Sequence, residues 1–318
     1  MDLVNSIGNR VEINVEPFGA ELLHEFEHEI IHIQHAYGYI PEWREMDKYL
    51  IPLSKAKIIT LHEIPLWPHE HWYDKVDVNF IVGNEMMERE LLKLGVQRDK
   101  LTVIPHGATI WNPLSKEESR SKLGLNILYK HVIVQPGFIS WGKGISEVIY
   151  AASRVPDTYV VFAGGVHPNA TPQDKRYLLQ CMKGAKSIGM ENRVHFVGSF
   201  LSEQELDLWM AAADILILNH QFVYGSYSAS AMAKRILCAE RPIIMSHDVR
   251  LSEYIDKEHC IKVVAEDIKQ VESAINKLIN NEEYGETLAK NAREYAIRHS
   301  WKNMADRHLE LYEKVLNA

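Results

Sequence analysis

The sequence predicts an α/β protein of two units, each built on a parallel sheet. Short apolar runs rich in β-branched residues alternate with amphipathic helical stretches along most of the 318 residues. Strands separated by helices are typical of βαβ units, in which the helix returns the chain to the same edge of the sheet. A proline at residue 113, followed by a helix-capping pattern, separates two such series. We therefore expect a first domain at residues 1–110 and a second at 111–299.

The first domain is predicted from short, closely spaced strands. One clear helix is expected at residues 85–95, where a stripe of helical period ends at a glycine. A second amphipathic helix is expected at the end of the sequence, over residues 300–318. The strand-like runs lie at residues 11–17, 30–38, 56–65, 78–84 and 101–107.

The second domain shows the alternation more regularly. Its strands are expected at residues 131–136, 159–164, 193–198, 214–219, 242–246 and 260–265. Its helices are expected at residues 143–155, 174–189, 203–213, 228–240 and 267–281. This order predicts a doubly wound sheet, and in such sheets ligands bind at the carboxyl ends of the strands.

Composition narrows the class of protein. The formal net charge of −8 argues against a broad electrostatic grip on nucleic acid or anionic lipid. The three cysteines, Cys181, Cys238 and Cys260, are too far apart in the sequence for a metal or redox pair and suit a reducing compartment. The first residues lack the pattern of a signal peptide, and no apolar run approaches the roughly 20 residues of a membrane span. We expect a cytoplasmic protein without a nucleic-acid partner.

The stretch "HEFEH" at residues 24–28 matches the zinc-protease pattern H-E-x-x-H. On a helix, His24 and His28 would share a face and could bind zinc, with Glu25 as the base. The residues that follow look like a buried strand, however, and Gln34 stands where a third ligand would be needed. We expect no metal site here.

The stretch "GFISWGKG" at residues 137–144 resembles a phosphate-binding P-loop. It lacks the Ser or Thr that holds magnesium, because Gly144 occupies that position. What remains is a strand, a glycine-containing turn and a helix expected to begin near Lys143. This arrangement brings backbone N–H groups, a helix dipole and an ammonium together, which favours an anion site. An ordinary tight turn between a strand and a helix is the alternative.

The order of motifs from residue 103 onward resembles the retaining glycosyltransferases of family 4. The resemblance is carried by "VIPHGA", "QPGFISWGKGISEVIYAA", "YVVFAGG", "VHFVGSF", "YGSYSASAMAKRILCAERPII" and the closing "SWKNMADRHLELYEKVL". The first domain is similar more loosely, through "IIHIQHAYG" and "ITLHEIP". The resemblance implies a GT-B fold, in which two Rossmann-like domains face a cleft and the last helix crosses back to the first domain. It also implies a nucleotide-sugar donor on the second domain, an acceptor on the first, and no metal or other cofactor.

The sequence departs from the pattern of that family in three respects. Lys143 matches a donor-binding lysine, but Phe138 replaces the usual arginine. Phe222 and Ser230 stand where the family has two glutamates, as in a subset with a serine-rich motif. Part of the usual first domain has no counterpart, so we expect either a shortened acceptor-side domain or a chain without its natural start.

The resemblance assigns candidate residues to the donor site. His62 and Lys143 are the expected catalytic residues, His62 near the donor sugar and Lys143 at the leaving diphosphate. The serines are expected at a helix start, where hydroxyl and N–H groups could contact phosphate or ribose; helix capping is the alternative. The donor-binding candidates are Gly137, Phe138, Lys143, Gly144, His106, Gly107, Gly165, His167, Val197, Gly198, Gly225, Ser226, Ser228 and Ser230.

Two functions remain open from the sequence. The first is a retaining, metal-independent glycosyltransferase that acts on an unknown glycan, lipid-linked or small-molecule acceptor, with His35 as a weak acceptor-side candidate and His32 ambiguous. The second is a non-catalytic nucleotide-sugar or glycan-binding protein on the same scaffold, suggested by the replacements at Phe138, Phe222 and Ser230. A lipid-linked acceptor would bring peripheral contact with a membrane.

Overall fold

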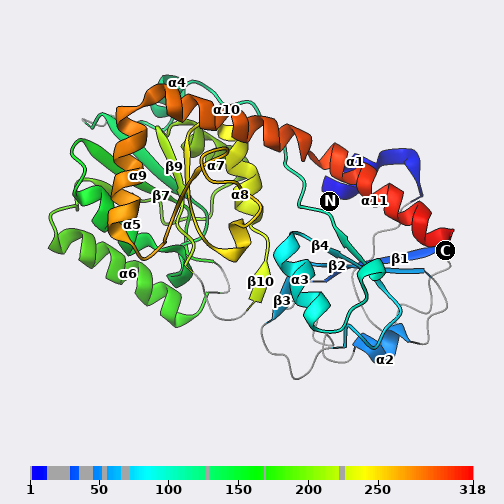
Figure 1. Cartoon of the computed structure of the whole chain (residues 1–318). Coiled ribbons are helices and arrows are strands. Elements are labelled where there is room, and N and C mark those ends of the chain that lie inside the picture. Colours follow the sequence, from blue (N-terminus) through cyan, green and yellow to red (C-terminus); the bar gives the residue numbers. More distant parts are fainter. Residues whose placement is uncertain are drawn as a thin grey trace. The chain divides into compact units, whose positions relative to one another are not determined.

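The structure is a computed structural model in which residues 2–12, 29–35, 46–51, 56–65, 72–125, 129–167, 170–221 and 226–317 are described. The chain divides into two compact units (Figure 1). Unit 1 contains residues 1–108, 223–230 and 299–318, and unit 2 contains residues 109–222 and 231–298. The segment 223–230, expected in the second domain, thus belongs to unit 1. Every helix in the described ranges is too short or too polar to cross a lipid bilayer.

Unit 1 is built on a four-stranded parallel sheet in the order β1-β2-β4-β5. A separate pair of short antiparallel strands joins β3 to β10. The strands are β1 (Ile30–His35), β2 (Ala56–Leu61), β3 (Glu63–Pro65), β4 (Asn79–Val82), β5 (Leu101–Val103) and β10 (Ser226–Ser228). The helices are α1 (Asp2–Ile7), α2 (Met46–Leu50), α3 (Glu85–Lys93) and α11 (Trp301–Leu316).

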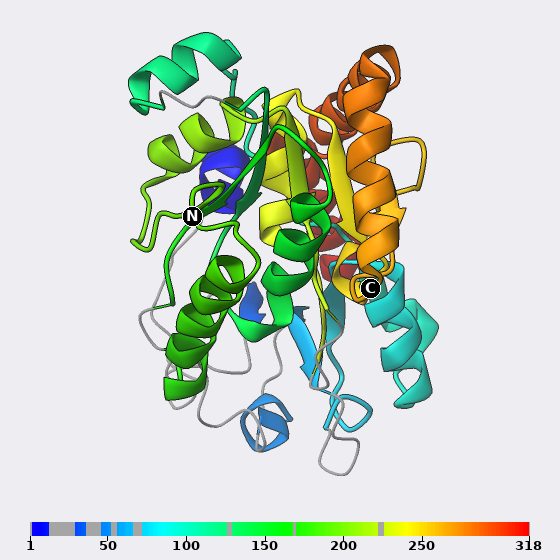
Figure 2. The same ribbon diagram turned by 90° about the vertical axis from the view of Figure 1, so that its left-hand side faces the viewer.

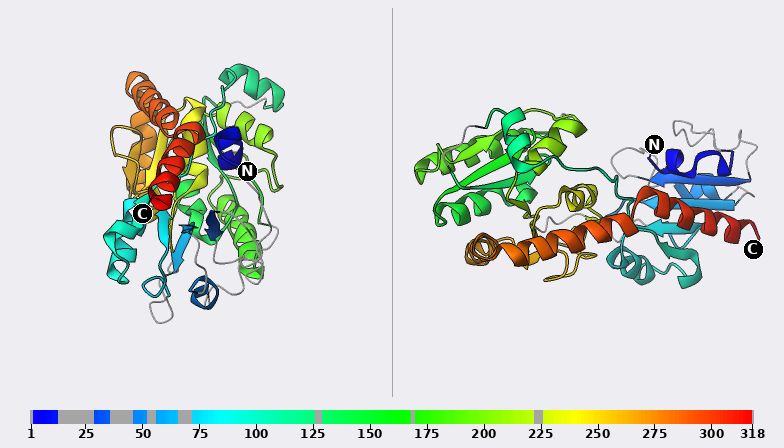
Figure 3. Two further views of the ribbon diagram at one scale, coloured as in Figure 1. Left: turned by 90° about the vertical axis from the view of Figure 1, so that its right-hand side faces the viewer. Right: turned by 90° about the horizontal axis from the view of Figure 1, so that it is seen from above.

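Helix α11 packs on the sheet of unit 1 although it lies at the end of the sequence (Figure 3). Met304 and Leu311 of α11 are buried against Ile58, Ile81 and Ile104. Ser300 begins the helix by accepting a hydrogen bond from the backbone N–H of residue 303, as a good N-cap residue does. The apolar stripe read from the sequence therefore faces the sheet, and the last helix completes the core of the first unit.

Unit 2 is built on a six-stranded parallel sheet in the order β12-β11-β9-β6-β7-β8. Its central strands are buried along nearly their whole length, because helices cover both faces of a sheet of this kind. The strands are β6 (His131–Pro136), β7 (Thr158–Ala163), β8 (Val194–Phe196), β9 (Ile215–Leu218), β11 (Ile243–Ser246) and β12 (Ile261–Val263). The helices are α4 (Lys116–Lys122), α5 (Ile145–Ser153), α6 (Pro172–Ser187), α7 (Glu203–Ala211), α8 (Ala231–Ile236), α9 (Ile268–Asn280) and α10 (Glu282–Arg298).

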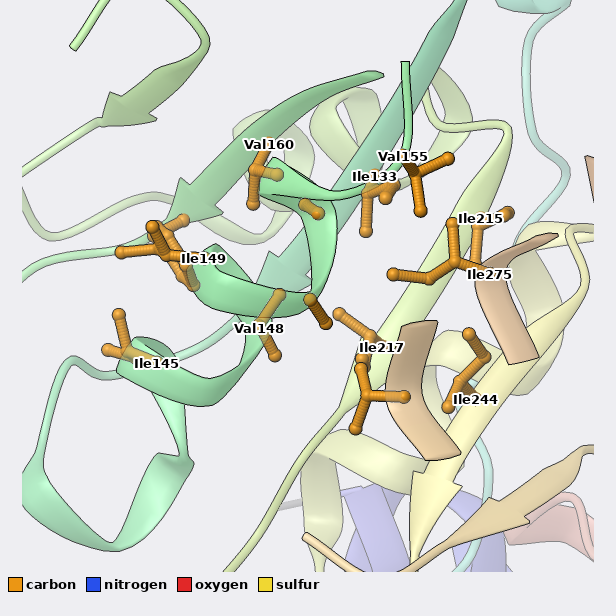
Figure 4. Close-up of a cluster of buried hydrophobic side chains, with 14 of the residues drawn as sticks. Ile133, Ile145, Val148, Ile149, Val155, Val160, Ile215, Ile217, Ile244 and Ile275 are labelled. Carbon is orange, nitrogen blue, oxygen red and sulfur yellow. The ribbon is translucent and has the colours of Figure 1, made fainter. Parts of the chain in front are cut away.

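The main core of unit 2 lies between its sheet and helices α5, α6 and α9, which share one face (Figure 2). Val148 and Ile149 of α5 belong to the same buried cluster as strand residues such as Ile133 and Ile217, in which β-branched side chains predominate (Figure 4). Burial of such side chains stabilises by about 1.5–3 kcal/mol each relative to leaving them exposed. This packing holds the loops at the carboxyl ends of the strands on a rigid base.

Several elements differ from the sequence prediction. The strand expected at residues 11–17 lies mostly outside the described residues. The run expected at 56–65 is interrupted at His62, so that β3 leaves the main sheet and pairs with β10. Helix α10 had no predicted counterpart, and Gly285 lies within it. A β-carbon at Gly285 would lie 3.4 Å from the Pro242 ring, which is an ordinary van der Waals contact, so the packing there does not require a glycine.

Candidate active site

The best-defined candidate site lies at the carboxyl edge of the sheet in unit 2. There the loop after β6 forms a 3₁₀ turn at Trp141–Lys143 before α5 begins at Ile145. The side-chain amide of Gln135 donates to the carbonyl of Lys143 at 2.7 Å. The backbone N–H of Gln221, after β9, donates to the carbonyl of Gly142 at 3.0 Å. Two neighbouring strands therefore fix the backbone that carries Lys143.

The Lys143 ammonium is mostly buried and is held by a histidine. Its Nζ lies 2.9 Å from Nε2 of His220, a side chain that is only 2% exposed. Burial, and secondarily the nearby Arg250 guanidinium, lower the pKa of Lys143 to about 8. Burial and the surrounding cations also hold the pKa of His220 well below its usual value, so the imidazole is neutral and accepts a hydrogen bond from the ammonium. The lysine therefore remains mainly charged at pH 7 in a fixed position.

Two further cations lie around His220 and make this edge of the sheet electropositive. Arg250, in the turn after β11, is paired with Asp248 through Nε–Oδ1 and Nη2–Oδ2 contacts of 2.6 and 3.0 Å. Lys262 of β12 donates to the Leu251 carbonyl at 2.7 Å. Beside His220, Lys143 and Arg250 thus share the single carboxylate of Asp248, while Lys262 also lies near Asp256 and Glu253, in a chain whose formal net charge is −8. Such a local excess of positive charge favours an anionic ligand.

Glycines allow the loops at this edge to approach one another closely. Gly144 has φ of +56°, and a β-carbon there would lie 2.4 Å from Nδ2 of Asn219. A β-carbon on Gly164 would lie 2.2 Å from the Gly137 carbonyl oxygen, and one on Gly165 would lie 2.8 Å from the Ser199 backbone. Glycine is therefore required at these positions, because any β-carbon would prevent the loops from packing against one another. Whether Gly137, Gly144 and Gly165 also touch a ligand stays a prediction.

Three aromatic side chains gather beside the glycine loops. The Phe138 ring meets the His167 ring edge-on, with centroids 4.7 Å apart, and lies 6.1 Å from the Phe200 ring. Phe200 is 72% exposed and Phe138 is 39% exposed. Val197 and Gly198 bring the chain back from β8 to this place, where the Gly198 N–H donates to the Gly164 carbonyl at 3.0 Å. The residue that replaces the family's arginine thus forms part of an exposed aromatic group.

In unit 1, two of the predicted histidines lie together. His62 follows β2 and His106 follows β5, and their rings stack with centroids 5.3 Å apart and an angle of 12° between planes. Burial lowers the pKa of His62, which favours the neutral ring. The neighbouring Gly107 has a packing role, because a β-carbon there would lie 2.3 Å from the Trp301 ring at the start of α11.

The serine-rich motif does not form a helix start as expected. Ser226 and Ser228 belong to β10, which pairs with β3 through the register of Ser226 with Pro65 and Ser228 with Glu63. The side-chain amide of Asn84 donates to the carbonyl of Ser228 at 3.1 Å, which fixes this strand further. Only Ser230 immediately precedes α8. The local sequence pattern did not reveal that β10 pairs with β3. The predicted helix at this motif therefore began too early.

Several predicted residues fall outside the described part of the chain. They include His24, Glu25 and His28 of the zinc-type motif, together with Phe222 and Gly225. His35 ends β1, but its side chain is not described. Within the described ranges, no group of three or more His, Cys, Asp or Glu side chains is arranged to hold a metal ion.

Sequence reasoning missed His220, Arg250 and Gln34. His220 directly follows a predicted strand, and Arg250 follows another one by four residues. The rule that ligands bind at the carboxyl ends of parallel strands could have indicated both residues. Gln34 entered the sequence reasoning only as a missing metal ligand, whereas its amide contacts His62 at 2.9 Å.

The fold and the site together define a class of protein. Two Rossmann-like units, with a cationic, glycine-lined edge on the second, are the framework of the GT-B glycosyltransferases. The family model of glycosyl transferases group 1 matches residues 115–295, which is more than half of the chain. The chain belongs to this family.

Two similar proteins support the assignment to this family. The N,N'-diacetylbacillosaminyl-diphospho-undecaprenol alpha-1,3-N-acetylgalactosaminyltransferase of Campylobacter jejuni is 24% identical over 257 residues, covering 74% of this chain and 60% of that protein. The alpha-galactosylglucosyldiacylglycerol synthase of Streptococcus pneumoniae is 31% identical over 99 residues, covering 30% of this chain and 26% of that protein. The chain thus spans less than two thirds of either relative.

A solved structure shows the same fold. The Anabaena protein HepE, solved in complex with UDP, matches with a TM-score of 0.78 and 16% identity, over 93% of this chain and 80% of that protein. At this identity the likeness concerns the fold alone.

Proposed function

We propose that the chain is a retaining, metal-independent glycosyltransferase that uses a nucleoside-diphosphate sugar as donor. One observation carries the proposal: the Lys143 ammonium is held 2.9 Å from His220 at the cationic carboxyl edge of the sheet in unit 2. A buried ammonium in a fixed position is suited to offset charge that develops on a leaving diphosphate. HepE has been solved with UDP and with UDP-glucose, which supports a nucleotide sugar as the ligand class.

In the proposed reaction the bond between the anomeric carbon and the diphosphate oxygen breaks, and the oxygen keeps the electron pair. The acceptor hydroxyl oxygen bonds to the anomeric carbon from the face that the diphosphate leaves, so configuration is retained. The hydroxyl proton passes to the departing phosphate oxygen. Lys143 stabilises the leaving group, and Arg250 provides the second cation that Phe138 does not supply.

The acceptor and the location are part of the same proposal. The name of one relative specifies a diphospho-undecaprenol-linked saccharide as acceptor, and the name of the other specifies a diacylglycerol glycolipid as product. We propose a lipid-linked saccharide as the acceptor class, reached by peripheral contact with a membrane. The cysteines Cys181, Cys238 and Cys260 are buried and free, which supports a cytoplasmic location.

The proposal is tested with a panel of UDP-, GDP- and dTDP-sugars. Calorimetry measures binding, and NMR of the product made with a lipid-linked acceptor gives the anomeric configuration. We expect binding of at least one donor, a retained configuration, and full activity after treatment with EDTA. Folded protein that binds none of these nucleotides would refute the donor assignment. An inverted product or a loss of activity restored by a divalent cation would refute the mechanism.

A further inference from the structure

A chain of side-chain hydrogen bonds connects helix α11 to His62 within unit 1. The hydroxyl of Tyr312, on α11, lies 2.6 Å from Nδ1 of His32 on β1. On the other edge of that ring, Nε2 lies 2.8 Å from the Thr60 hydroxyl and 3.1 Å from Nε2 of Gln34. The other end of the Gln34 amide, Oε1, lies 2.9 Å from Nε2 of His62. Five side chains from three elements and the turn after β2 therefore form one connected network.

The amide of Gln34 gives this network a direction. An amide nitrogen only donates and an amide oxygen only accepts. With the amide oriented as in the structure, Nε2 of Gln34 donates to Nε2 of His32, so that ring nitrogen is the unprotonated one. The proton of His32 is then on Nδ1 and is donated to the Tyr312 hydroxyl oxygen. Because Oε1 of Gln34 accepts from Nε2 of His62, the proton of His62 is on Nε2.

His32, at the centre of the network, and Tyr312, at one end, are both held neutral, as this pattern requires. Burial lowers the pKa of His32 to about 3 and raises the pKa of Tyr312 to about 12. Nδ1 of the neighbouring His308 donates to the Met304 carbonyl at 2.7 Å, and its ring stacks on that of His32 with centroids 5.8 Å apart. His62 makes no other hydrogen bond with a described residue, and its ring stacks on His106. Within the described part of the chain, its Nδ1 is therefore left as an open acceptor.

We propose that Gln34 is a positioning residue that fixes His62 as the Nε2–H tautomer, so that Nδ1 presents a lone pair to the substrate. A lone pair accepts a hydrogen bond from a hydroxyl group but not from a phosphate oxygen. This tautomer fits the position near the donor sugar that the resemblance implies for His62, because it leaves Nδ1 able to accept from a sugar or acceptor hydroxyl. This use of His62 rests on the proposed function, whereas the tautomer itself is a property of the free protein.

The experiment measures the tautomer of His62 directly. Protein labelled with ¹⁵N in its histidine rings is examined by long-range ¹H–¹⁵N correlation at pH 8.5, without substrate, and the signals are assigned with His62→Gln and His32→Gln variants. Gln34→Leu removes both functions of the amide, and Gln34→Glu keeps only the acceptor. Gln97→Leu, which changes an exposed glutamine of the same unit, is the matched control.

In the native protein we expect His62 to carry its proton on Nε2. Gln34→Leu should populate both tautomers of His62. Gln34→Glu should keep His62 unchanged but move the proton of His32 from Nδ1 to Nε2, because both neighbours of the carboxylate must then donate. The control should match the native protein. A proton on Nδ1 of native His62, or a His62 signal that does not respond to Gln34→Leu, would overturn the assignment.

Turnover provides a separate readout. With a donor and acceptor identified, Gln34→Leu should lower kcat by about tenfold, the effect of one hydrogen bond of ordinary strength. Gln34→Glu should restore most of this loss, because it still accepts from Nε2 of His62. If the tautomers shift as expected but kcat does not change, the positioning role in catalysis is rejected. If no donor binds, the proposed function fails. The tautomer assignment is then judged by the NMR experiment alone.

Discussion

Substitution of Lys143 by methionine should change stability and ligand binding in opposite directions. Burial lowers the pKa of Lys143 from its ordinary 10.5 to about 8. A difference of this size corresponds to about 3 kcal/mol of disfavoured charge in the folded protein. The cost is present in full below pH 8 and disappears as the pH rises from 8 to 10.5, because the unfolded lysine remains charged until the higher value.

At pH 7, Lys143→Met removes this cost but leaves Nε2 of His220 without its donor. An unpaired buried polar atom costs about 1–3 kcal/mol. The free variant should therefore be as stable as the native protein or up to about 2 kcal/mol more stable. Loss of one charge-assisted contact to the diphosphate should weaken donor binding by about 1.5–3 kcal/mol, or roughly ten- to a hundredfold in Kd.

The assay compares thermal unfolding of the free proteins with calorimetric titration of UDP and GDP. Lys183→Met, which replaces an exposed lysine on α6, is the control and should change neither quantity. A Lys143→Met protein that is destabilised by several kcal/mol and binds a nucleotide with native affinity would refute the reasoning. The lysine would then be a structural residue.

Three further predictions follow from particular contacts. Since the ammonium of Lys143 is lost above a pKa of about 8, kcat/KM should fall above that pH by up to about tenfold per unit, and Lys143→Met should abolish this dependence. Gly144→Ala, which places a β-carbon 2.4 Å from a side-chain nitrogen at φ of +56°, should lower the free energy of unfolding by about 2–5 kcal/mol in urea titrations. Gly184→Ala, at an open position within α6, should instead raise the free energy of unfolding by about 0.5–1 kcal/mol. Equal effects of Gly144→Ala and Gly184→Ala would contradict the steric argument. Lys234→Met should cost about 3–5 kcal/mol because it leaves the Glu253 carboxylate, 2.6 Å away, buried without its ion-pair partner, and adding Glu253→Gln should recover most of the loss.

Local sequence patterns were sufficient for much of the second unit. The strands β6, β7, β9 and β11 and helices α5, α6 and α9 lie where apolar runs and helical periodicity predicted them. This success has a physical basis, because strands buried on both faces require nearly continuous apolar sequence. The position of Lys143 at the end of β6 follows from the same pattern, since the glycines on either side mark the turn.

The sequence by itself thus determined the α/β class, the order of the main elements and the edge of the sheet where the lysine lies. The tertiary structure alone decided which side chains surround that lysine. His220 and Arg250 reach Lys143 from strands far away in the sequence. The tertiary structure also decided that Ser226 and Ser228 form a strand. Their partner β3 lies more than 150 residues away, so the local sequence does not indicate the pairing. The Gln34 amide is directional because, besides His32 on its own strand, it contacts His62 in the turn after β2, 28 residues further along the chain, and no local pattern encodes that contact.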